Sequence, residues 1–481
     1  MKKTLKSLTS LSYSTIISLL SGIIRTKLLA VYLGVNGLGI FSQLTTFFNL
    51  LNFIIPLGIP LGLTKFISEK EKEDLIFIKT VYENILKLFL ITSIVSGSVI
   101  CIFSKYISQI LLNTQDYYLF VILLGIILPV NVIGFFFDAY LKGLKQIKLF
   151  VRITVISSLV TLVFYFPLVY YFDIAGAILS LFVNSFIVLY LSYSNLKKSG
   201  LTGKISLTLP KFNNLGGIFQ IGIGSLITGS VLQLMYLILR TITINELGIH
   251  ENGIYQSIFN ISQNYFGFIF ISMSAYTLPK YSELKNDKDL IQEINVNLRI
   301  VLFAIVPLIG LFYLFQDAIL TLAFSRDFLN AARLLKYQFL GDFFKTTSWI
   351  LGLWLIARGK ILIWVLLDVL YSINFIVIYY SLLEYYTKDL VAISMAYLIC
   401  NLIHLILNII VINKYLSFTF TKNNLIMILL SFLTIVMVIF TTDINLNLSY
   451  FLTPLFLIIW LFITTDKNER KGVYHLLKNK N

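Results

Sequence analysis

The chain has 481 residues, of which 58% are hydrophobic, 15% aromatic and only 13% charged. This composition, with a mean hydropathy of +0.86, excludes a soluble globular domain and indicates a polytopic membrane protein. The net charge of +15 could suggest a nucleic-acid partner, but no soluble segment carries a basic block, so nucleic acid is excluded and the charge is assigned to membrane topology.

Apolar segments of membrane-spanning length follow one another along the chain. About twenty helical residues cross the ~30 Å hydrocarbon layer, and the sequence predicts about fourteen such helices, which makes the expected fold class an all-α polytopic membrane protein. The last two are the shortest. The predicted spans are Leu11–Leu33, Phe41–Thr64, Ile85–Phe103, Leu119–Leu141, Ile153–Tyr171, Ala175–Tyr193, Leu215–Ile238, Gly253–Leu278, Ile300–Leu320, Phe339–Ile356, Ile361–Leu382, Leu390–Ile412, Leu425–Phe440 and Phe451–Ile463.

The basic residues predict the orientation of these spans. Most of the 38 Lys and Arg residues fall in segments on the side of the N-terminus, as the positive-inside rule requires if both termini are cytoplasmic. The apolar stretch after the basic start is too long for a signal peptide, so we expect it to stay attached. The loops on the other side hold few basic residues, namely Lys105, Arg326, Arg333, Lys336 and Lys388.

The chain contains an internal repeat with an offset of about 215 residues. Gly34 and Gly39 in LGVNGLGIF match Gly248 and Gly253 in LGIHENGIY, at an offset of 214. Further on, Lys65-Phe66 matches Lys280-Tyr281, and Lys142-Gly143 matches Arg358-Gly359. Three matches in the same order predict two copies of six spans each.

The repeat predicts the domain organisation. Residues 1–195 and 215–413 form two six-helix bundles, residues 196–214 form a cytoplasmic linker, and residues 414–481 add two further spans and a basic cytoplasmic tail. Because six spans is an even number, both copies point the same way, and their pseudo-two-fold axis runs along the membrane normal. A substrate path is then expected between the bundles.

Two arginines lie within or at the edge of predicted spans. A guanidinium at bilayer depth costs at least a few kcal/mol, so it usually faces a protein or aqueous interior. Arg25 continues a helical face formed by Ser14, Ser18 and Ser21, and Arg240 continues a similar face in the seventh span. We therefore expect both to line a cationic chamber; the alternative for Arg240 is a place at the outer interface.

Other polar residues are candidate cavity residues. Lys27 is flanked by apolar residues and could instead extend to an interface, and Lys65 lies at the inner end of the second span. Amides recur on the second and eighth spans, where they could bond helix to helix or contact a ligand. These amides are Asn49, Asn52, Gln256, Asn260 and Asn264.

Few acidic residues lie at membrane depth. Asp138 and Asp368 are candidates for coupling to a cation, whereas Asp342 is three residues before Lys345, as in a helical ion pair. His404 shares a face with Asn401 and Asn408 but lacks further ligands, so no metal site is expected. Cys101 and Cys400 show no partner spacing.

The sequence motifs of common membrane enzymes are absent from the sequence. There is no Walker pattern, GIGSLITG has the wrong spacing for a dinucleotide site, and no outer loop combines large size with paired carboxylates. Catalysis is therefore not expected, and no cofactor is expected.

The residues described above resemble the polysaccharide-unit flippases of the Wzx or O-antigen transporter type, in the multidrug/oligosaccharidyl-lipid/polysaccharide (MOP) superfamily. The resemblance lies in SGIIRTKLLAVYLGVNGLGIFSQL, in the Pro56 and Pro60 pair, in Lys65 and in the basic-Gly turns at Gly143 and Gly359. It extends over about Leu5 to Asn413.

The resemblance implies a pair of six-helix bundles of the MATE/MOP type in the bacterial inner membrane. Their substrate would be an undecaprenyl-diphosphate-linked oligosaccharide for O antigen, capsule or a related lipopolysaccharide or surface polymer, and a polysaccharide polymerase and a chain-length regulator would be candidate partners. Arginine suits the diphosphate, because its planar donors match phosphate oxygens. The driving force stays open between a Na⁺ or H⁺ gradient, the membrane potential and removal of the product.

Alternative functions remain from the sequence. A lipid-linked peptidoglycan precursor flippase of the same superfamily shares the cationic cavity and the fourteen spans. A multidrug or cation antiporter is expected to carry acidic residues where this chain has Arg25. A membrane glycosyltransferase is the remaining alternative.

Overall fold

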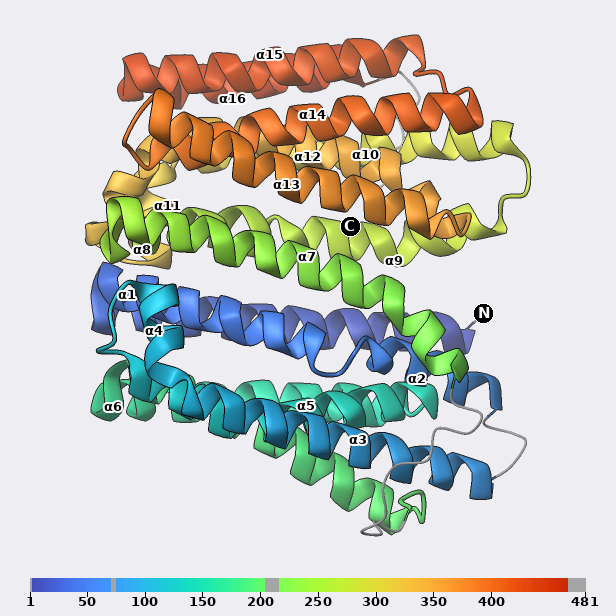
Figure 1. Ribbon diagram of the computed structural model, residues 1–481. Coiled ribbons are helices and arrows are strands. Elements are labelled where there is room, and N and C mark those ends of the chain that lie inside the picture. Colours follow the sequence, from blue (N-terminus) through green and yellow to red (C-terminus); the bar gives the residue numbers. More distant parts are fainter. Residues whose placement is uncertain (1, 71–74, 204–215, 466–481) are drawn as a thin grey trace, which may run out of the picture. The chain divides into compact units, whose positions relative to one another are not determined.

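The computed structural model describes residues 2–70, 75–203 and 216–465, and its regular structure over these residues is helical (Figure 1). Residues 204–214 of the expected linker and the tail 466–481 lie outside the described residues. The first part of the chain forms α1 (Lys2–Ile54), α2 (Ile59–Lys70), α3 (Leu75–Ile102), α4 (Ser104–Leu112), α5 (Tyr118–Gly143), α6 (Ile147–Lys198), α7 (Gly216–Leu247) and α8 (Ile249–Phe259). The second part forms the π-helix η1 (Asn260–Tyr265), α9 (Gly267–Glu283), α10 (Asp287–Leu314), α11 (Gln316–Ala323), the 3-10 helix η2 (Arg326–Ala331), α12 (Ala332–Ala357), α13 (Ile361–Tyr385), α14 (Val391–Leu416), α15 (Lys422–Ile444) and α16 (Leu446–Thr464).

The helices account for the expected spans. Ten of the described helices are long and apolar enough to cross a membrane. Two of these are α1 and α6, each of which breaks once, at Gly34 (φ 63°) and at Asp173 (φ 49°), and so provides two crossings. With α8, η1 and α9 as a further crossing and α12 as another, the prediction of about fourteen spans is confirmed. The short last spans are the full helices α15 and α16.

The second span differs from its expected continuous form. The helix stops at Ile54, Gly58 has φ 69°, and α2 starts at Ile59. Pro56 explains the break, because proline has no N–H to donate and its ring collides with the preceding turn. Two short helices were not predicted: α4 lies in a segment expected to be an outer loop, and α11 overlaps the end of the predicted span Ile300–Leu320.

Contacts divide the described helices into two compact units. Unit 1 comprises the described residues of Met1–Ser257 with Leu322–Phe328 and Asp368–Ile376; unit 2 comprises those of Ile258–Thr321, Leu329–Leu367 and Val377–Asn481. The expected bundle boundaries at residues 195, 214 and 413, and the pseudo-two-fold axis, stay predictions.

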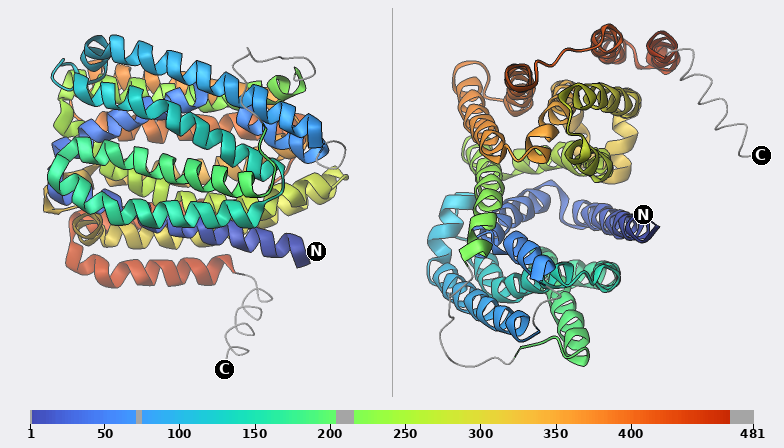
Figure 2. Two further views of the ribbon diagram at one scale, coloured as in Figure 1. Left: turned by 90° about the horizontal axis from the view of Figure 1, so that it is seen from below. Right: turned by 90° about the vertical axis from the view of Figure 1, so that its right-hand side faces the viewer.

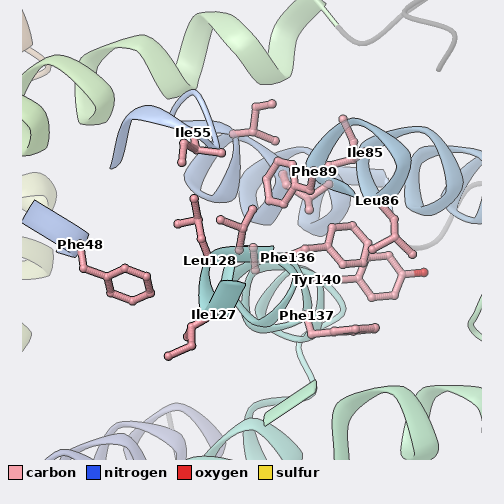
Figure 3. Packing of buried hydrophobic residues seen from close by; sticks show 14 of the residues in the cluster. Phe48, Ile55, Ile85, Leu86, Phe89, Ile127, Leu128, Phe136, Phe137 and Tyr140 are labelled. Atoms are coloured by element: carbon pink, nitrogen blue, oxygen red, sulfur yellow. The ribbon is translucent and has the colours of Figure 1, made fainter. Parts of the chain in front are cut away.

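The core of unit 1 lies around α5. Helix α5 packs against α3 and α6, and α6 packs against α1. The axes of the helices in this part of the chain are roughly aligned (Figure 2). Aromatic rings fill this core, with the Tyr82 ring 5.2 Å from those of Phe136 and Tyr140, and the Phe89 ring 6.1 Å from that of Phe136. Figure 3 shows Phe89, Phe136 and Tyr140 among the clustered side chains. Gly97 and Gly125 bring α3 and α5 into backbone contact, as small residues do in membrane bundles.

The core of unit 2 lies around α12, which packs on α14 and α10. Helices α15 and α16 run side by side (Figure 1), and the indole of Trp460 donates to Ser431 Oγ at 2.9 Å. Asn424 Nδ2 donates to Asn295 Oδ1 at 2.9 Å, which attaches α15 to α10. The last two helices are thus part of unit 2.

The internal repeat is visible in the backbone. Adding 214 to the bounds of α5 gives those of α12. Gly34 and its counterpart Gly248 (φ 97°) both have positive φ. The turn after α5 has its positive φ at Lys145 and the turn after α12 at Gly359, again 214 apart. The match of Gly143 with Gly359 is therefore wrong by two residues.

Candidate functional site

Arg25 lies on the face of α1 that packs against α6. One turn before it, Ser21 Oγ donates to Ser158 O at 3.1 Å, and Ser18 Oγ lies 2.9 Å from Ser158 Oγ. The serine face thus bonds helix to helix. Arg25 is half-buried, with Tyr165 of α6 near enough to interact electrostatically.

The guanidinium of Arg25 retains donors that the protein does not use. Its Nε donates to Ser21 O at 3.4 Å. Within the described part of the chain, the two terminal nitrogens have no hydrogen-bond partner. These are the donors that a planar anion would accept from.

Arg240 is in a different environment, because its side chain is only 1% exposed. It donates to Ser42 Oγ at 2.9 Å, to Asn252 Oδ1 at 3.3 Å and to Gln256 Oε1. The ring of Tyr255 lies 5.6 Å from its guanidinium carbon. Arg240 therefore joins α7 to α1 and α8, all within unit 1.

The two candidate lysines have protein partners. Lys27 Nζ donates to the carbonyl of Phe324, the residue that follows α11, so it does not simply extend to an interface. Lys65 is exposed and lies 4.0 Å from Glu69, four residues on. Such an exposed pair contributes only ~0.3–0.5 kcal/mol.

The candidate amides divide by exposure. Asn49 and Asn264 are exposed. Asn264 Nδ2 donates to Asn260 Oδ1 at 2.8 Å, inside η1, and Gln256 accepts from Arg240. Asn52 Oδ1 accepts from Asn131 Nδ2 at 2.8 Å, so helix-to-helix bonding accounts for Asn52.

The two coupling candidates occupy dissimilar places. Asp138 is half-buried on α5, one turn before Lys142. Asp368 is half-buried on α13, and its carbonyl accepts from Ser372 Oγ at 2.8 Å. Among the described residues, no group of three or more His, Cys, Asp or Glu is placed to hold a metal ion.

Paired glycines bring the two copies into backbone contact within unit 1. A Cβ on Gly39 would lie 2.4 Å from Ile249 O, and one on Gly253 would lie 2.0 Å from Val35 O. These contacts are reciprocal under the 214 offset. At the other end of α7, a Cβ on Gly58 would lie 2.1 Å from Gly222 O. The start of the second copy is therefore in close contact with the first at both ends of α7.

The family model described as "Polysaccharide biosynthesis protein" matches residues 4–285. The chain belongs to the polysaccharide biosynthesis protein family.

The chain is also similar to known flippases in sequence and to solved transporters in fold. The chain is 26% identical over 358 residues to the lipid III flippases of Escherichia coli (strain K12) and Shigella flexneri, covering 74% of this chain and 86% of each relative. Its fold is similar to that of the lipid II flippase MurJ in an inward closed conformation (TM-score 0.70, 16% identity, 93% of this chain and 97% of that one). It is also similar to an inward-facing MATE transporter of the MOP superfamily (TM-score 0.70, 16% identity, 85% and 98%). The fold is thus that of a multi-pass MOP-superfamily membrane protein.

The sequence patterns did not identify all the residues that surround Arg240. Ser42 and Asn252, which hold Arg240, were not singled out, although Asn252 stands between the repeated glycines Gly248 and Gly253. Ser42 gave no signal, because one serine in an apolar helix is common in membrane proteins.

Proposed function

We propose that this family member is a flippase that moves a polyprenyl-diphosphate-linked saccharide from the cytoplasmic to the outer leaflet. The observation that carries the proposal is the similarity to lipid III flippases along most of their length. The chain would thus act as a transporter, in agreement with its flippase and transporter relatives, and not as an enzyme.

The environment of Arg25 supports an anionic headgroup as cargo. Its terminal nitrogens donate no hydrogen bond to the described residues. It also lies in a helix of membrane-spanning length, where a charged side chain is costly and is usually found at a functional site. Arg240 is already bonded, so in this conformation we assign it to holding α7 against α1 and α8. Contact of Arg240 with cargo would require these helices to separate.

The glycine contacts support transport by alternating access, in which helices separate at one end of the path at a time. In this structure α7 and α8 meet the first copy at both ends of α7, through Gly39 and Gly253 and through Gly58 and Gly222. Transport would open one of these contacts while the other stays closed. Lys65, Asn49 and Asn264, which are exposed, are proposed secondary contacts of the cargo.

The cargo itself has two main alternatives. One is the lipid-linked repeat unit of O antigen, and the other is a different lipid-linked saccharide precursor. The similarity to lipid III flippases supports the second alternative better than the first. We therefore favour a lipid-linked saccharide precursor other than the O-antigen unit as the cargo. A multidrug antiporter has the similar fold in its favour, but Arg25 occupies the depth where such a protein is expected to have an acid.

Reconstitution of the full-length protein tests the function. We expect liposomes containing it to expose a fluorescent undecaprenyl-diphosphate saccharide of the inner leaflet to an impermeant quencher, and protein-free liposomes not to do so. Expression in strains lacking the lipid III, lipid II or O-antigen flippase then identifies the cargo. Equal quenching with and without the protein would contradict the proposal.

A further inference from the structure

A second polar site lies inside unit 2, where η1, α12 and α14 meet. The Asp342 side chain is 2% exposed, and its Oδ1 accepts from Ser262 Oγ at 2.6 Å and from the Tyr397 hydroxyl at 2.7 Å. Gln338 Nε2 donates to Ser262 Oγ at 3.0 Å. The carboxyl of Asp342 is thus fixed by hydroxyl groups from two neighbouring elements.

Two side-chain oxygens of this site accept no hydrogen bond from the described residues. Within the described residues, neither Asp342 Oδ2 nor Gln338 Oε1 has a hydrogen-bond partner, and both atoms are buried. Asp342 and Gln338 are four residues apart on α12, so they lie on one face, and both contact Ser262. A buried acceptor without a donor destabilises the folded protein, because it has lost its hydrogen bonds to water. A proton on Asp342 Oδ2 would turn this acceptor into a donor on the face that also carries Gln338.

The backbone is adapted to this site. Ser262 lies in η1, where Phe266 N donates to Ile261 O at 3.2 Å in the wide π pattern. In this turn, consecutive side chains reach α12, since Ser262 bonds to Asp342 while Gln263 Oε1 accepts from Lys345 Nζ at 2.5 Å. Single π turns inside α-helices occur frequently at functional sites.

The first copy of the repeat shows that packing alone does not require these polar residues. The 214 offset pairs Asp342 with Leu128, Gln338 with Leu124 and Ser262 with Phe48. Leu128 and Leu124 are 0% exposed and Phe48 is 3% exposed. The same helix of the fold is therefore built with an apolar face in one copy and with a buried carboxyl in the other.

We propose that Asp342 is a proton-binding site that couples transport to the proton gradient. The proton bonds to Oδ2, and the new O–H donates to Gln338 Oε1; release returns the proton to water and leaves the carboxylate facing Ser262 and Tyr397. The proposal rests on the proposed function for its coupling, whereas proton binding itself does not.

A proton fits this site better than a metal cation. The Ser262 and Tyr397 hydroxyls direct their hydrogens toward Oδ1, so two bare oxygens remain, too few to replace the water shell of a metal ion. The ammonium of Lys345, one turn further along α12, would also repel a second cation. When Asp342 is ionised, Lys345 supplies the opposite charge.

The titratable groups around Asp342 come from several elements packed on α12. The helix itself contributes Lys345, and η1 contributes only neutral side chains. Helix α10 contributes Tyr313, whose hydroxyl donates to Asp443 of α15 at 2.6 Å. Helix α9 has its charged residues near its C-terminal end, at Lys280 and Glu283. Helix α14 contributes Tyr397, Cys400 and His404, the last with Nδ1 3.1 Å from Ser348 Oγ.

Infrared spectroscopy of the full-length protein in lipid tests proton binding directly. We expect a C=O stretching band of a buried protonated carboxyl that disappears on alkaline titration, is absent in Asp342→Asn and is present in the matched variant Asp138→Asn. Asp342→Asn should fold, because its amide can donate to Gln338 Oε1. Gln338→Leu, which copies Leu124, gives a second folded variant in which the pH midpoint of the band should move. A band that survives in Asp342→Asn would overturn the site.

Flipping in liposomes tests the coupling. We expect an imposed pH gradient to change the initial rate for the wild type several-fold, and the ratio of rates with and without the gradient to fall to one in Asp342→Asn. Acceleration by a sodium gradient at constant pH, lost in the same variant, would overturn the proton in favour of sodium. Absence of any flipping by the wild type, with the infrared band intact, would contradict the proposed function and leave the proton site standing.

Discussion

The two intramembrane arginines have the same residue type and similar positions in the repeat, yet they differ in what surrounds them. Arg25 keeps its terminal nitrogens free of described protein partners, whereas Arg240 is bonded to Ser42, Asn252 and Gln256. The sequence could place both at membrane depth by counting apolar residues. It could not separate them, because the residues that bury Arg240 come from distant segments.

Substitution of Arg25 should affect transport more than stability. We expect Arg25→Ala to lower the flipping rate at least about tenfold, since a charge-assisted contact contributes ~1.5–3 kcal/mol, and Arg25→Lys to retain part of it because the charge remains. Lys388→Ala, at an exposed lysine between α13 and α14, is the control and should flip at nearly the wild-type rate. Normal flipping by Arg25→Ala would remove Arg25 from the cargo site.

Substitution of Arg240 should affect stability first. Arg240→Ala would leave the buried Oδ1 of Asn252 without this donor, at a cost of about 1–3 kcal/mol. Ser42 Oγ would keep Gly39 O and Asn252 Nδ2 as partners. We expect a lower thermal unfolding temperature in detergent, measured by tryptophan fluorescence, and a smaller change for Arg25→Ala. An unchanged unfolding temperature would contradict the structural role of Arg240.

At the scale of elements, apolar length predicted the crossings well and the breaks poorly. The bounds of α5 and α13 follow the predicted spans within a few residues, because only long apolar helices satisfy the backbone in lipid. The break after Ile54 and the π-helix at Asn260–Tyr265 were not predicted. Both depend on local backbone geometry that hydrophobicity does not report.

The glycine pair between α1 and α8 can be tested by adding a side chain. Gly39→Val and Gly253→Val should each separate these elements, because even a Cβ would lie 2.4 Å and 2.0 Å from a carbonyl oxygen. We expect both variants to lower the yield of monodisperse protein and to abolish flipping. Gly22→Ala, at a helical glycine with nothing within 4 Å of its Cβ, is the control and should behave as wild type.

At the scale of the whole molecule, the repeat offset and the order of six spans plus six plus two could be predicted from the sequence. The packing that distinguishes the copies could not. Gly39 of the first copy and Gly253 of the second each contact the backbone of the other copy. The sequence shows that these glycines recur but not that they make this reciprocal contact. The polar site at Asp342 was interpreted as a helical ion pair with Lys345, whereas Lys345 bonds to Gln263.

Cross-linking tests whether the contact between α1 and α8 opens during transport. Asn252 Nδ2 lies 3.3 Å from Ser42 Oγ, so the two positions are adjacent, and a cysteine is placed at each to form a cross-link on oxidation. In a background with Cys101 and Cys400 replaced by Ala, we expect oxidation to stop flipping and reduction to restore it. The two single-cysteine variants are the controls. Unchanged flipping by the oxidised double variant would show that this contact stays closed throughout the cycle.

Because α5 and α12 share one register, equivalent positions in the two copies of the repeat can be compared directly. Since the two helices have the same length and the same ends, a residue can be moved between them by adding or subtracting 214. A carboxyl introduced at Leu128, with hydroxyl and amide side chains introduced at Phe48 and Leu124, would test whether the first copy can also hold a buried carboxyl that binds a proton. If it can, the common ancestor of both copies could have had this group, with apolar side chains replacing it later in the first copy.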